Sequence, residues 1–342
     1  MTRLQKSAPA LFGALLFAAF FLSLFDPAVQ LYYRDTGRLY YAVKLYIAQQ
    51  LHAGYFPLWD RMTECGVSLL GQLTPGLLHP ATLLYLIFPF DVAFKLNHIL
   101  GSALAGVGAF RLARRLGASS WAALCAAVAY GGCGYLISVT GSNLPYALGA
   151  GSVPLAIDGV LGFVEKPGAL RLAWAGAAVA LIALAGEPQS MLIAGMIAGA
   201  WAALSGSSVK GALRNLGLTA CCGALALCLA APAIGPAVTE LRRSNRDLPL
   251  SLAERQVFAN SPSRLLGLLV PRAFDDAVEA QERSEPLTPY YEYFATGTTA
   301  FADTIVLGAP ALLFAAAALW TGRRGKLLVA GAALFALSSA GD

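Results

Sequence analysis

The sequence predicts an all-α integral membrane protein with about nine transmembrane helices, and three observations lead to that class. Of the 342 residues, 57% are hydrophobic and only 13% are charged, against about 45–50% and about 25% in ordinary globular chains. Apolar runs close to the ~20 residues needed to cross a bilayer recur along the chain. Most of the charged residues lie between these runs. A water-soluble monomer is therefore excluded, and the lipid bilayer is the first expected partner.

The composition and the motifs of the chain argue against several other protein classes. The net charge of +5 is modest, and no basic stretch interleaves with aromatic residues as in surfaces that track nucleic acid. We therefore expect no nucleic-acid partner. No phosphate-binding loop, zinc-hydrolase motif, nucleophile elbow or dinucleotide fingerprint occurs in a suitable context, which argues against ATP-driven transport and zinc hydrolysis.

The apolar runs give the expected spans. The first follows Arg3 and Lys6, but no small-residue cleavage site comes after it, so we interpret it as a helix and not as a signal peptide. A run near 75–90 is interrupted by three prolines and is expected not to cross. The nine spans are expected at about 8–25, 92–112, 121–139, 145–164, 170–186, 188–206, 214–238, 299–320 and 326–340.

Charge placement supports this count. With a cytoplasmic N-terminus and a non-crossing 75–90 run, every short cytoplasmic segment carries two or three basic residues, whereas the short external turns near 141–143 and 186–189 carry none. The positive-inside rule demands this asymmetry, and a crossing 75–90 run would reverse it. We therefore expect a multi-pass membrane protein with a cytoplasmic N-terminus and its active face outside.

Two long external segments follow from that topology, at about 26–91 and 239–298, within a single polytopic domain covering residues 1–342. They hold most of the 19 acidic residues. Loops longer than ~15 residues are uncommon unless they are functional, so the chemistry is expected on the outer face.

Asp35 is the leading candidate in the first external segment, where it should lie just above the membrane surface. A carboxylate at this boundary can deprotonate an acceptor hydroxyl. The alternative is an N-terminal charge that complements a helix dipole. Thr36 is expected to cap the following helix, which has an apolar stripe and lies flat at the headgroup level. The stripe is formed by Leu39, Val43, Ile47 and Leu51, with Lys44 pointing elsewhere.

Further polar residues are expected to contact substrate. In the turn between the fifth and sixth spans, Glu187 and Gln189 are expected to hold sugar hydroxyls, although a plain solvated turn would also carry them. In the second external segment, Arg243 and Arg246 suit the oxygens of a lipid phosphate. A solvated loop of alternating charge is the alternative there, and residues alone favour it.

Charged and polar residues inside the membrane are costly and usually face a bundle interior. Lys95 either snorkels outward or faces inward, His98 is expected to make a hydrogen bond between helices, and Asp158 is expected to be structural.

Taken together, several stretches resemble the YfhO-type family of bacterial polytopic membrane proteins, which belongs with the GT-C-fold glycosyltransferases. The similarity follows the same order over almost the whole chain. The stretches are Arg34–Arg38 with Tyr40 and Tyr41, Gly54–Asp60 followed by Gly66, Gln72 with Pro75, Gly76, His79 and Pro80, Gly186–Gln189, Ala230–Pro232 leading to Glu240 and Arg246, and Ser261–Pro271.

The resemblance implies a GT-C-like core with two interfacial helices in the first external loop. It implies transfer of a sugar from a polyprenyl-phosphate donor to an envelope glycan or lipid, with Asp35 as the catalytic residue. Within the matching motifs, Trp59, Asp60, Gln72 and His79 are the expected substrate-binding positions. A divalent metal is a cofactor in some GT-C families. The adjacent second acid of those families is missing here, so the metal site stays unassigned.

Family members are typically longer, so the chain is expected to be truncated relative to them. Two other functions stay open: a non-enzymatic transporter or lipid-handling protein whose polar path is Lys95, His98 and Asp158, and an inactive component of an envelope-assembly complex.

Overall fold

The computed structural model describes residues 3–63, 65–244, 251 and 267–269. The chain divides into two compact units, residues 1–132 with 139–245 and residues 133–138 with 246–342. The predicted spans at 299–320 and 326–340 and most of the second external segment lie outside the described residues.

The described chain is mostly helical, with one two-stranded antiparallel sheet. Its long helices are apolar along most of their length, and its short elements cluster between the first and fifth helices. In chain order the elements are α1 (Arg3–Phe21), η1 (Leu22–Phe25), η2 (Thr36–Tyr40), α2 (Tyr41–His52), β1 (Trp59–Asp60), β2 (Val67–Ser68), α3 (Leu69–Gln72), η3 (Pro80–Leu83), α4 (Leu84–Ile87), α5 (Phe90–Arg115), α6 (Ser120–Gly131), α7 (Gly134–Ser142), α8 (Leu144–Glu165), α9 (Ala169–Leu184), α10 (Pro188–Leu204) and α11 (Val209–Leu241).

Three described helices, α5, α8 and α11, are long and apolar enough to cross a membrane, and the pair α6 and α7, bent by 45°, gives a fourth if it counts as one span. The apolar helices Leu11–Phe25, α9 and α10 are shorter. The membrane character expected from the sequence is thus supported for the described residues. The total of nine spans stays a prediction.

The 75–90 run contains no long helix. Its helical elements, η3 and α4, comprise four residues each, and eight helical residues reach only about 12 Å. That length is well short of the ~30 Å hydrocarbon core. The non-crossing run inferred from charge placement agrees with this geometry.

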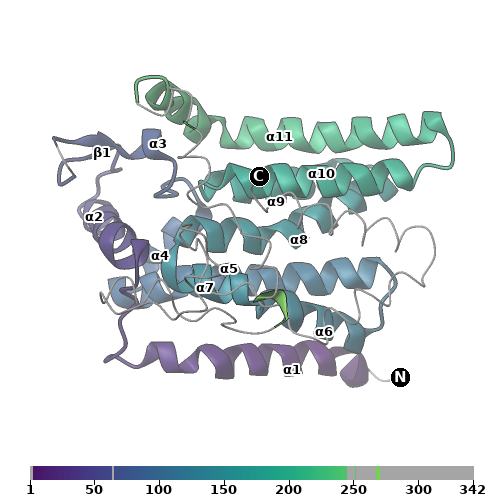
Figure 1. Cartoon of the computed structure of the whole chain (residues 1–342), viewed down its shortest axis with the longest axis horizontal. Coiled ribbons are helices and arrows are strands. Elements are labelled where there is room, and N and C mark those ends of the chain that lie inside the picture. The colour runs from purple at the N-terminus through teal and green to yellow at the C-terminus, as the bar shows by residue number, and fades with distance from the viewer. Residues whose placement is uncertain (1–2, 64, 245–250, 252–266, 270–342) are drawn as a thin grey trace. The chain divides into compact units, whose positions relative to one another are not determined.

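The helix α8 is the centre of the first unit. All residues of its most apolar window are buried, compared with 22% in α11. Figure 1 shows the long helices running side by side, with α5 on one side of α8 and α9, α10 and α11 on the other. A helix that is apolar all round must be covered on all sides, and α8 satisfies that rule.

Small residues set the close approach of α5 to α8. A Cβ atom at Gly101 would lie 2.6 Å from the carbonyl carbon of Ala147, and one at Gly108 would lie 2.5 Å from the backbone nitrogen of Leu155. Membrane helices commonly meet through such small residues. Because the contacts advance together along both helices, α5 and α8 run in the same direction.

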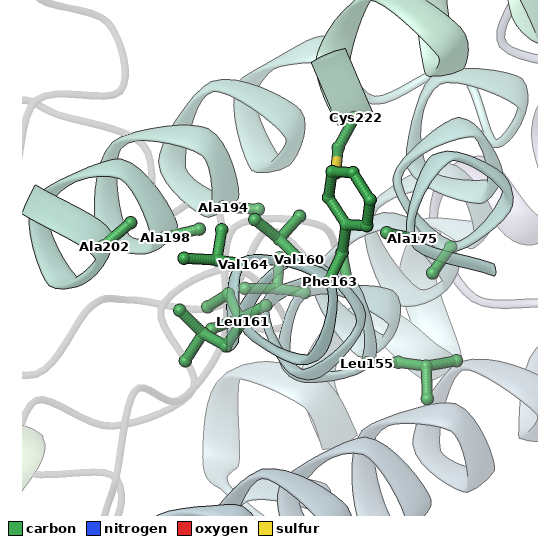
Figure 2. Packing of buried hydrophobic residues seen from close by; sticks show 14 of the residues in the cluster. Leu155, Val160, Leu161, Phe163, Val164, Ala175, Ala194, Ala198, Ala202 and Cys222 are labelled. Atoms are coloured by element: carbon green, nitrogen blue, oxygen red, sulfur yellow. The ribbon is translucent and has the colours of Figure 1, made fainter. Parts of the chain in front are cut away.

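The main hydrophobic core lies on the opposite side of α8. Val160, Phe163 and Val164 pack there against Ala175 of α9, Ala194 of α10 and Cys222 of α11 (Figure 2). In contrast, many large apolar side chains of α11 and α1 are exposed, among them Leu213, Leu227 and Leu15. Exposed apolar surface of this extent is typical of a lipid-facing protein.

Candidate functional site at the N-terminal ends of α5 and α8

The predicted catalytic residue, Asp35, is held by a side chain from a distant part of the sequence. It lies directly before η2, and its Oδ2 accepts a hydrogen bond of 3.1 Å from Nδ2 of Asn143. Asn143 occupies the N-cap position of α8. The hydroxyl of Tyr40 lies 3.2 Å from Oδ1 of the same amide. Asp35, Asn143 and Tyr40 therefore form one hydrogen-bonded row.

The chemistry of these three groups determines which atom donates in each hydrogen bond of the row. An ionised carboxylate only accepts hydrogen bonds, so the amide must turn its NH₂ group toward Asp35. The amide oxygen then faces Tyr40, whose hydroxyl must donate. Burial raises the pKa of the Tyr40 hydroxyl, and the charge of Asp35 raises it further, which keeps that proton in place.

Asp35 itself is exposed, whereas Tyr40 and Asn143 are buried. The hydrogen bond from Asn143 engages Oδ2. The arrangement thus combines an exposed carboxylate with a buried amide that orients it.

The backbone beside Asp35 is in an uncommon conformation. Arg34 has φ = 49° and Leu73 has φ = 56°, and these are the two non-glycine residues with positive φ in the described chain. Such conformations cost about 1–3 kcal/mol and cluster at functional sites. Both residues belong to the first predicted external segment.

Thr36 does not cap the helix as the sequence suggested. It is the first residue of η2 and is completely buried, with its Oγ1 3.4 Å from Nε2 of His98. The other ring nitrogen of His98 lies 2.9 Å from the carbonyl oxygen of Phe94. His98 thus links α5 to η2, as expected for a hydrogen bond between helices.

Lys44 was expected on the polar face of its helix, and that expectation was wrong. The side chain is 2% exposed, and its Nζ donates a hydrogen bond of 2.6 Å to the carbonyl oxygen of Pro75. The same ammonium lies 5.6 Å from the centre of the Tyr85 ring. Burial lowers the pKa of Lys44 to about 7.

Two buried polar atoms near Lys44 have no hydrogen-bond partner: Nε2 of His79 and Oδ1 of Asn97. Nδ1 of His79 accepts from the backbone nitrogen of Ala81, and Nδ2 of Asn97 donates to the Tyr85 hydroxyl at 3.0 Å. Burial lowers the pKa of His79 to about 3, and the charge of Lys44 contributes. Buried polar atoms without a partner are uncommon and call for an explanation.

Segments far apart in the sequence meet at this end of the unit. A Cβ atom at Gly186 would lie 2.7 Å from the carbonyl oxygen of Leu73, and one at Gly149 would lie 2.7 Å from Cβ of Glu187. Gly71 packs directly against the side chain of Glu240, near the end of α11. The loop around 71–76 therefore contacts both the turn at 184–187 and the end of α11, and the turn contacts the N-terminal part of α8.

Glu187 and Gln189 have different surroundings. Glu187 is buried and caps α10, because its Oε2 accepts from the backbone nitrogen of Ser190 at 2.7 Å. Gln189 is exposed. Gly149 lies six residues after Asn143, about 9 Å along α8, so Glu187 packs near the Asp35 row.

The other predicted substrate-binding residues are dispersed. Trp59 is 52% exposed on β1, whereas Asp60 is buried and accepts hydrogen bonds from Met62 and Thr63 within its own turn. Gln72 is half-buried at the end of α3, and Arg243 is exposed after α11. Arg246 lies outside the described residues. Their binding roles stay predictions.

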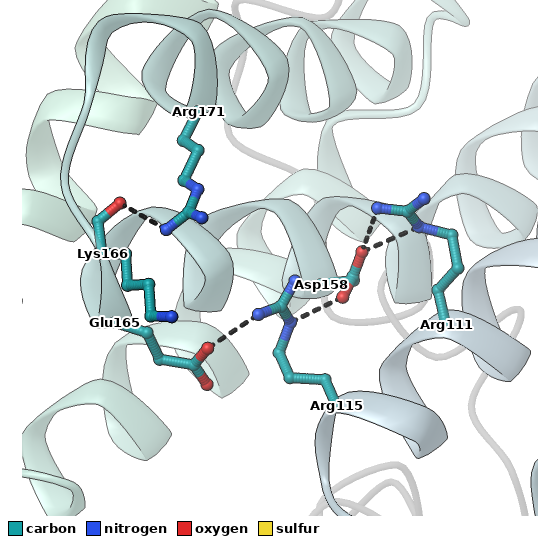
Figure 3. A network of polar contacts seen from close by, with 6 residues as sticks. All are labelled: Arg111, Arg115, Asp158, Glu165, Lys166 and Arg171. Atoms are coloured by element: carbon teal, nitrogen blue, oxygen red, sulfur yellow. Dashed lines mark hydrogen bonds and ion pairs between the residues drawn. The ribbon is translucent and has the colours of Figure 1, made fainter.

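A second polar cluster lies at the opposite ends of α5 and α8. Asp158 is 2% exposed, and its Oδ2 accepts from Arg111 at 2.9 Å while its Oδ1 accepts from Arg115 at 2.6 Å. Arg115 also reaches Glu165 at 2.7 Å. Figure 3 shows the guanidinium groups of Arg111 and Arg115 on either side of the Asp158 carboxylate. Asp158 is thus fully engaged, in agreement with a structural role.

Lys95 does not snorkel. It is 5% exposed and donates a hydrogen bond of 3.0 Å to the carbonyl oxygen of Asp26. It therefore ties the start of α5 to the segment that precedes Asp35.

Some GT-C enzymes use a divalent metal, which would need several acidic or imidazole ligands close together. Within the described part of the chain, no group of three or more His, Cys, Asp or Glu residues is placed to hold a metal ion. Around Asp35 the identified partner is an amide and not a second carboxylate. The described residues therefore do not fit a metal at this position.

Sequence reasoning missed Asn143, Tyr40 and Lys44 as parts of the site. For Lys44 the signal was the spacing of the buried face. The buried positions of α2 are 43, 44, 47 and 48. They follow the wide i, i+3, i+4 stripe of a packed helix and not a strict four-residue repeat. For Asn143 the only signal was its place in a short external turn. Comparisons with family models, curated proteins and solved structures found no match to this chain.

Proposed function

We propose that the chain is a membrane glycosyltransferase with a GT-C-like core, similar to the YfhO-type family. It transfers a sugar from a polyprenyl-phosphate donor to an envelope glycan or lipid on the outer face of a bacterial inner membrane. The observation that carries the proposal is the row Asp35–Asn143–Tyr40, which orients an exposed carboxylate at one end of the candidate membrane helices.

The proposed reaction uses Asp35 as a general base. Oδ1 accepts the proton of an acceptor hydroxyl while the acceptor oxygen attacks the anomeric carbon of the donor sugar. The bond between that carbon and the phosphate oxygen breaks, and the polyprenyl phosphate leaves with the electron pair. Attack opposite the leaving group inverts the anomeric centre. Asn143 holds Oδ2, so the reactive oxygen keeps its orientation through the step.

The proposed substrate contacts surround this row. Glu187 packs on the same part of α8, while Gln189, Trp59, Gln72 and Arg243 lie on or near the surface. We propose that these residues, together with His79, Asp60 and Arg246, contact the sugar, the acceptor or the lipid phosphate. A cytoplasmic N-terminus and nine spans complete the proposed topology.

Transport by a path through Lys95, His98 and Asp158 gains less support. His98 and Arg111, a partner of Asp158, are 13 residues apart on α5, about 20 Å along the helix axis. Between them α5 and α8 are in contact at Gly101 and Gly108. All three residues of the supposed path also have partners within the protein.

The test is Asp35→Asn in proteoliposomes supplied with polyprenyl-phosphate-linked sugars and an envelope-glycan extract. A general base contributes about 10²–10⁴-fold to a rate, so transfer should fall by at least a hundredfold with an unchanged unfolding midpoint. Asp91→Asn is the matched control, because Asp91 is also exposed in a first helical turn, that of α5. Transfer retained in Asp35→Asn, or movement of lipid without bond cleavage in the wild type, contradicts the proposal.

A further inference from the structure

The buried cluster around Lys44 contains more hydrogen-bond donors than the described residues satisfy. The ammonium of Lys44 has three N–H groups, and the carbonyl oxygen of Pro75 is its hydrogen-bond acceptor. Nδ1 of His79 accepts a hydrogen bond, so in the neutral ring the proton lies on Nε2, the atom that has no partner. Lys44 and His79 thus both have N–H groups to donate.

In the structure the unpaired atom of Asn97 is an acceptor, Oδ1, and Asn97 joins the same pattern only when its amide is turned. Its amide and the Tyr85 hydroxyl are 3.0 Å apart, and either atom of the amide can make that contact, because the hydroxyl both donates and accepts. Turning the amide so that Oδ1 accepts from Tyr85 removes the unpaired oxygen and leaves an NH₂ group unpaired instead. In that orientation Lys44, His79 and Asn97 all have unused donors.

The cluster also lacks negative charge. Lys44, His79 and His98 are all buried, and the charge of Lys44 acts on both imidazole rings. Among the described residues, no carboxylate forms an ion pair with Lys44. A buried cation without a counter-ion is strongly unfavourable, and an anion would supply the missing charge and the missing acceptors together.

The cluster lies close to the surface and close to the Asp35 row. His79 is flanked by Leu78, which is half-buried, and by the exposed Pro80. Lys44 lies one helical turn after Tyr40, which donates to the amide that holds Asp35. One short helix, α2 with its N-terminal extension η2, therefore joins both sets of residues.

We propose that Lys44, His79 and Asn97 form a binding site for a phosphate-class oxyanion. A tetrahedral oxyanion accepts several hydrogen bonds at once. Its oxygens accept from the N–H groups of the Lys44 ammonium that do not donate to Pro75. Free phosphate and a lipid-linked phosphate share this chemistry. If the ligand is lipid-linked, it is the phosphate of the sugar donor, an identification that rests on the proposed function.

The test uses the full-length protein in a glycoside detergent, which contains no phosphate. Unfolding midpoints are measured against inorganic phosphate at constant ionic strength, with chloride as the reference anion, at pH 6.5. The wild type should show a saturable rise in the midpoint. Lys44→Met should weaken the apparent affinity by at least about tenfold, because a hydrogen bond to a charged group contributes about 1.5–3 kcal/mol. Lys44→Arg should retain most of it.

Lys95→Met is the matched control, since Lys95 is also a buried lysine that donates to one carbonyl oxygen, and it should bind phosphate as the wild type does. A short-chain polyprenyl phosphate separates the two sources: tighter binding than inorganic phosphate indicates a lipid-linked ligand, and equal binding indicates the free ion. Asp35→Asn should abolish transfer and leave phosphate binding unchanged, so the two proposals fail separately.

Two results overturn the inference. One is the absence of a saturable midpoint shift in the wild type, as expected if the cluster holds only water. The other is equal phosphate affinity in the wild type and the folded Lys44→Met variant.

Discussion

The two ends of the α5–α8 pair bury polar groups in opposite ways. At the C-terminal ends, Asp158 is buried and both of its oxygens meet arginines. At the N-terminal ends, His79 and Asn97 each retain an unpaired buried atom, Lys44 lacks an acidic partner among the described residues, and Asp35 faces outward. Buried polar groups that satisfy one another stabilise or specify a fold, whereas unsatisfied ones call for an explanation such as a bound ligand or water. This difference is the reason that both proposals place function at the N-terminal ends.

The largest predicted effect is a pH dependence of stability that originates at Lys44. Its pKa is about 7 in the folded protein and about 10.4 when unfolded. Between these values the unfolded state binds more protons, so stability increases as the pH rises from 7 to about 10.4. The contribution is on the order of 4 kcal/mol. Unfolding midpoints across this window should rise less steeply in Lys44→Met than in the wild type or Lys95→Met.

Removing Asp158 should reduce stability without altering the chemistry. Asp158→Ala leaves Arg111 and Arg115, which are 47% and 24% exposed, without their shared carboxylate, and a hydrogen bond to a charged group contributes about 1.5–3 kcal/mol. Glu165→Ala is the comparison, because that side chain is 54% exposed and exposed pairs contribute about 0–1 kcal/mol. Denaturant unfolding checks both variants. An equal loss of stability in the two would refute the special role of burial.

Asn143→Ala should have the opposite effect to Asp158→Ala, because it should alter the chemistry and not the stability. Without its Nδ2 donor, Asp35 loses its fixed orientation, and transfer should fall by about tenfold to a hundredfold, which corresponds to one or two hydrogen bonds to a charged group. Rate measurements over a pH range distinguish this positioning role from a purely structural one. The limb that reports the base should move in Asn143→Ala, whereas a fold defect would lower the rate equally at every pH.

Tyr40→Phe should have the smallest effect. The hydroxyl orients the amide of Asn143 and does not contact Asp35, so its removal costs about 1 kcal/mol, roughly a fivefold loss of rate. Kinetics of Tyr40→Phe, Asn143→Ala and the double variant measure the coupling. Independent, additive effects would contradict the shared row.

The sequence predicted the helical membrane class and the non-crossing 75–90 run, because apolar length and charge asymmetry are local properties that a bilayer enforces. It also named Asp35, whose catalytic role stays a prediction. It did not predict that Asn143, 108 residues away, would hold Asp35, because that contact depends on α8 beginning beside η2. Lys44 was assigned to the wrong face because a lone lysine beside an apolar stripe is expected to point toward water. Its burial depends on the hydrogen bond to the carbonyl group of Pro75, which is a tertiary contact. Thr36 was assigned as a cap because the pairing of its side chain with His98 is likewise a tertiary contact.

The most direct test of the contrast between the two ends compares Asp35→Asn with Asp158→Ala, measuring both sugar transfer per folded molecule and the unfolding midpoint. Asp35→Asn should lose transfer by at least about a hundredfold and keep its midpoint, while Asp158→Ala should lower its midpoint and keep its transfer rate. Transfer retained in Asp35→Asn, or lost in folded Asp158→Ala, would contradict the account.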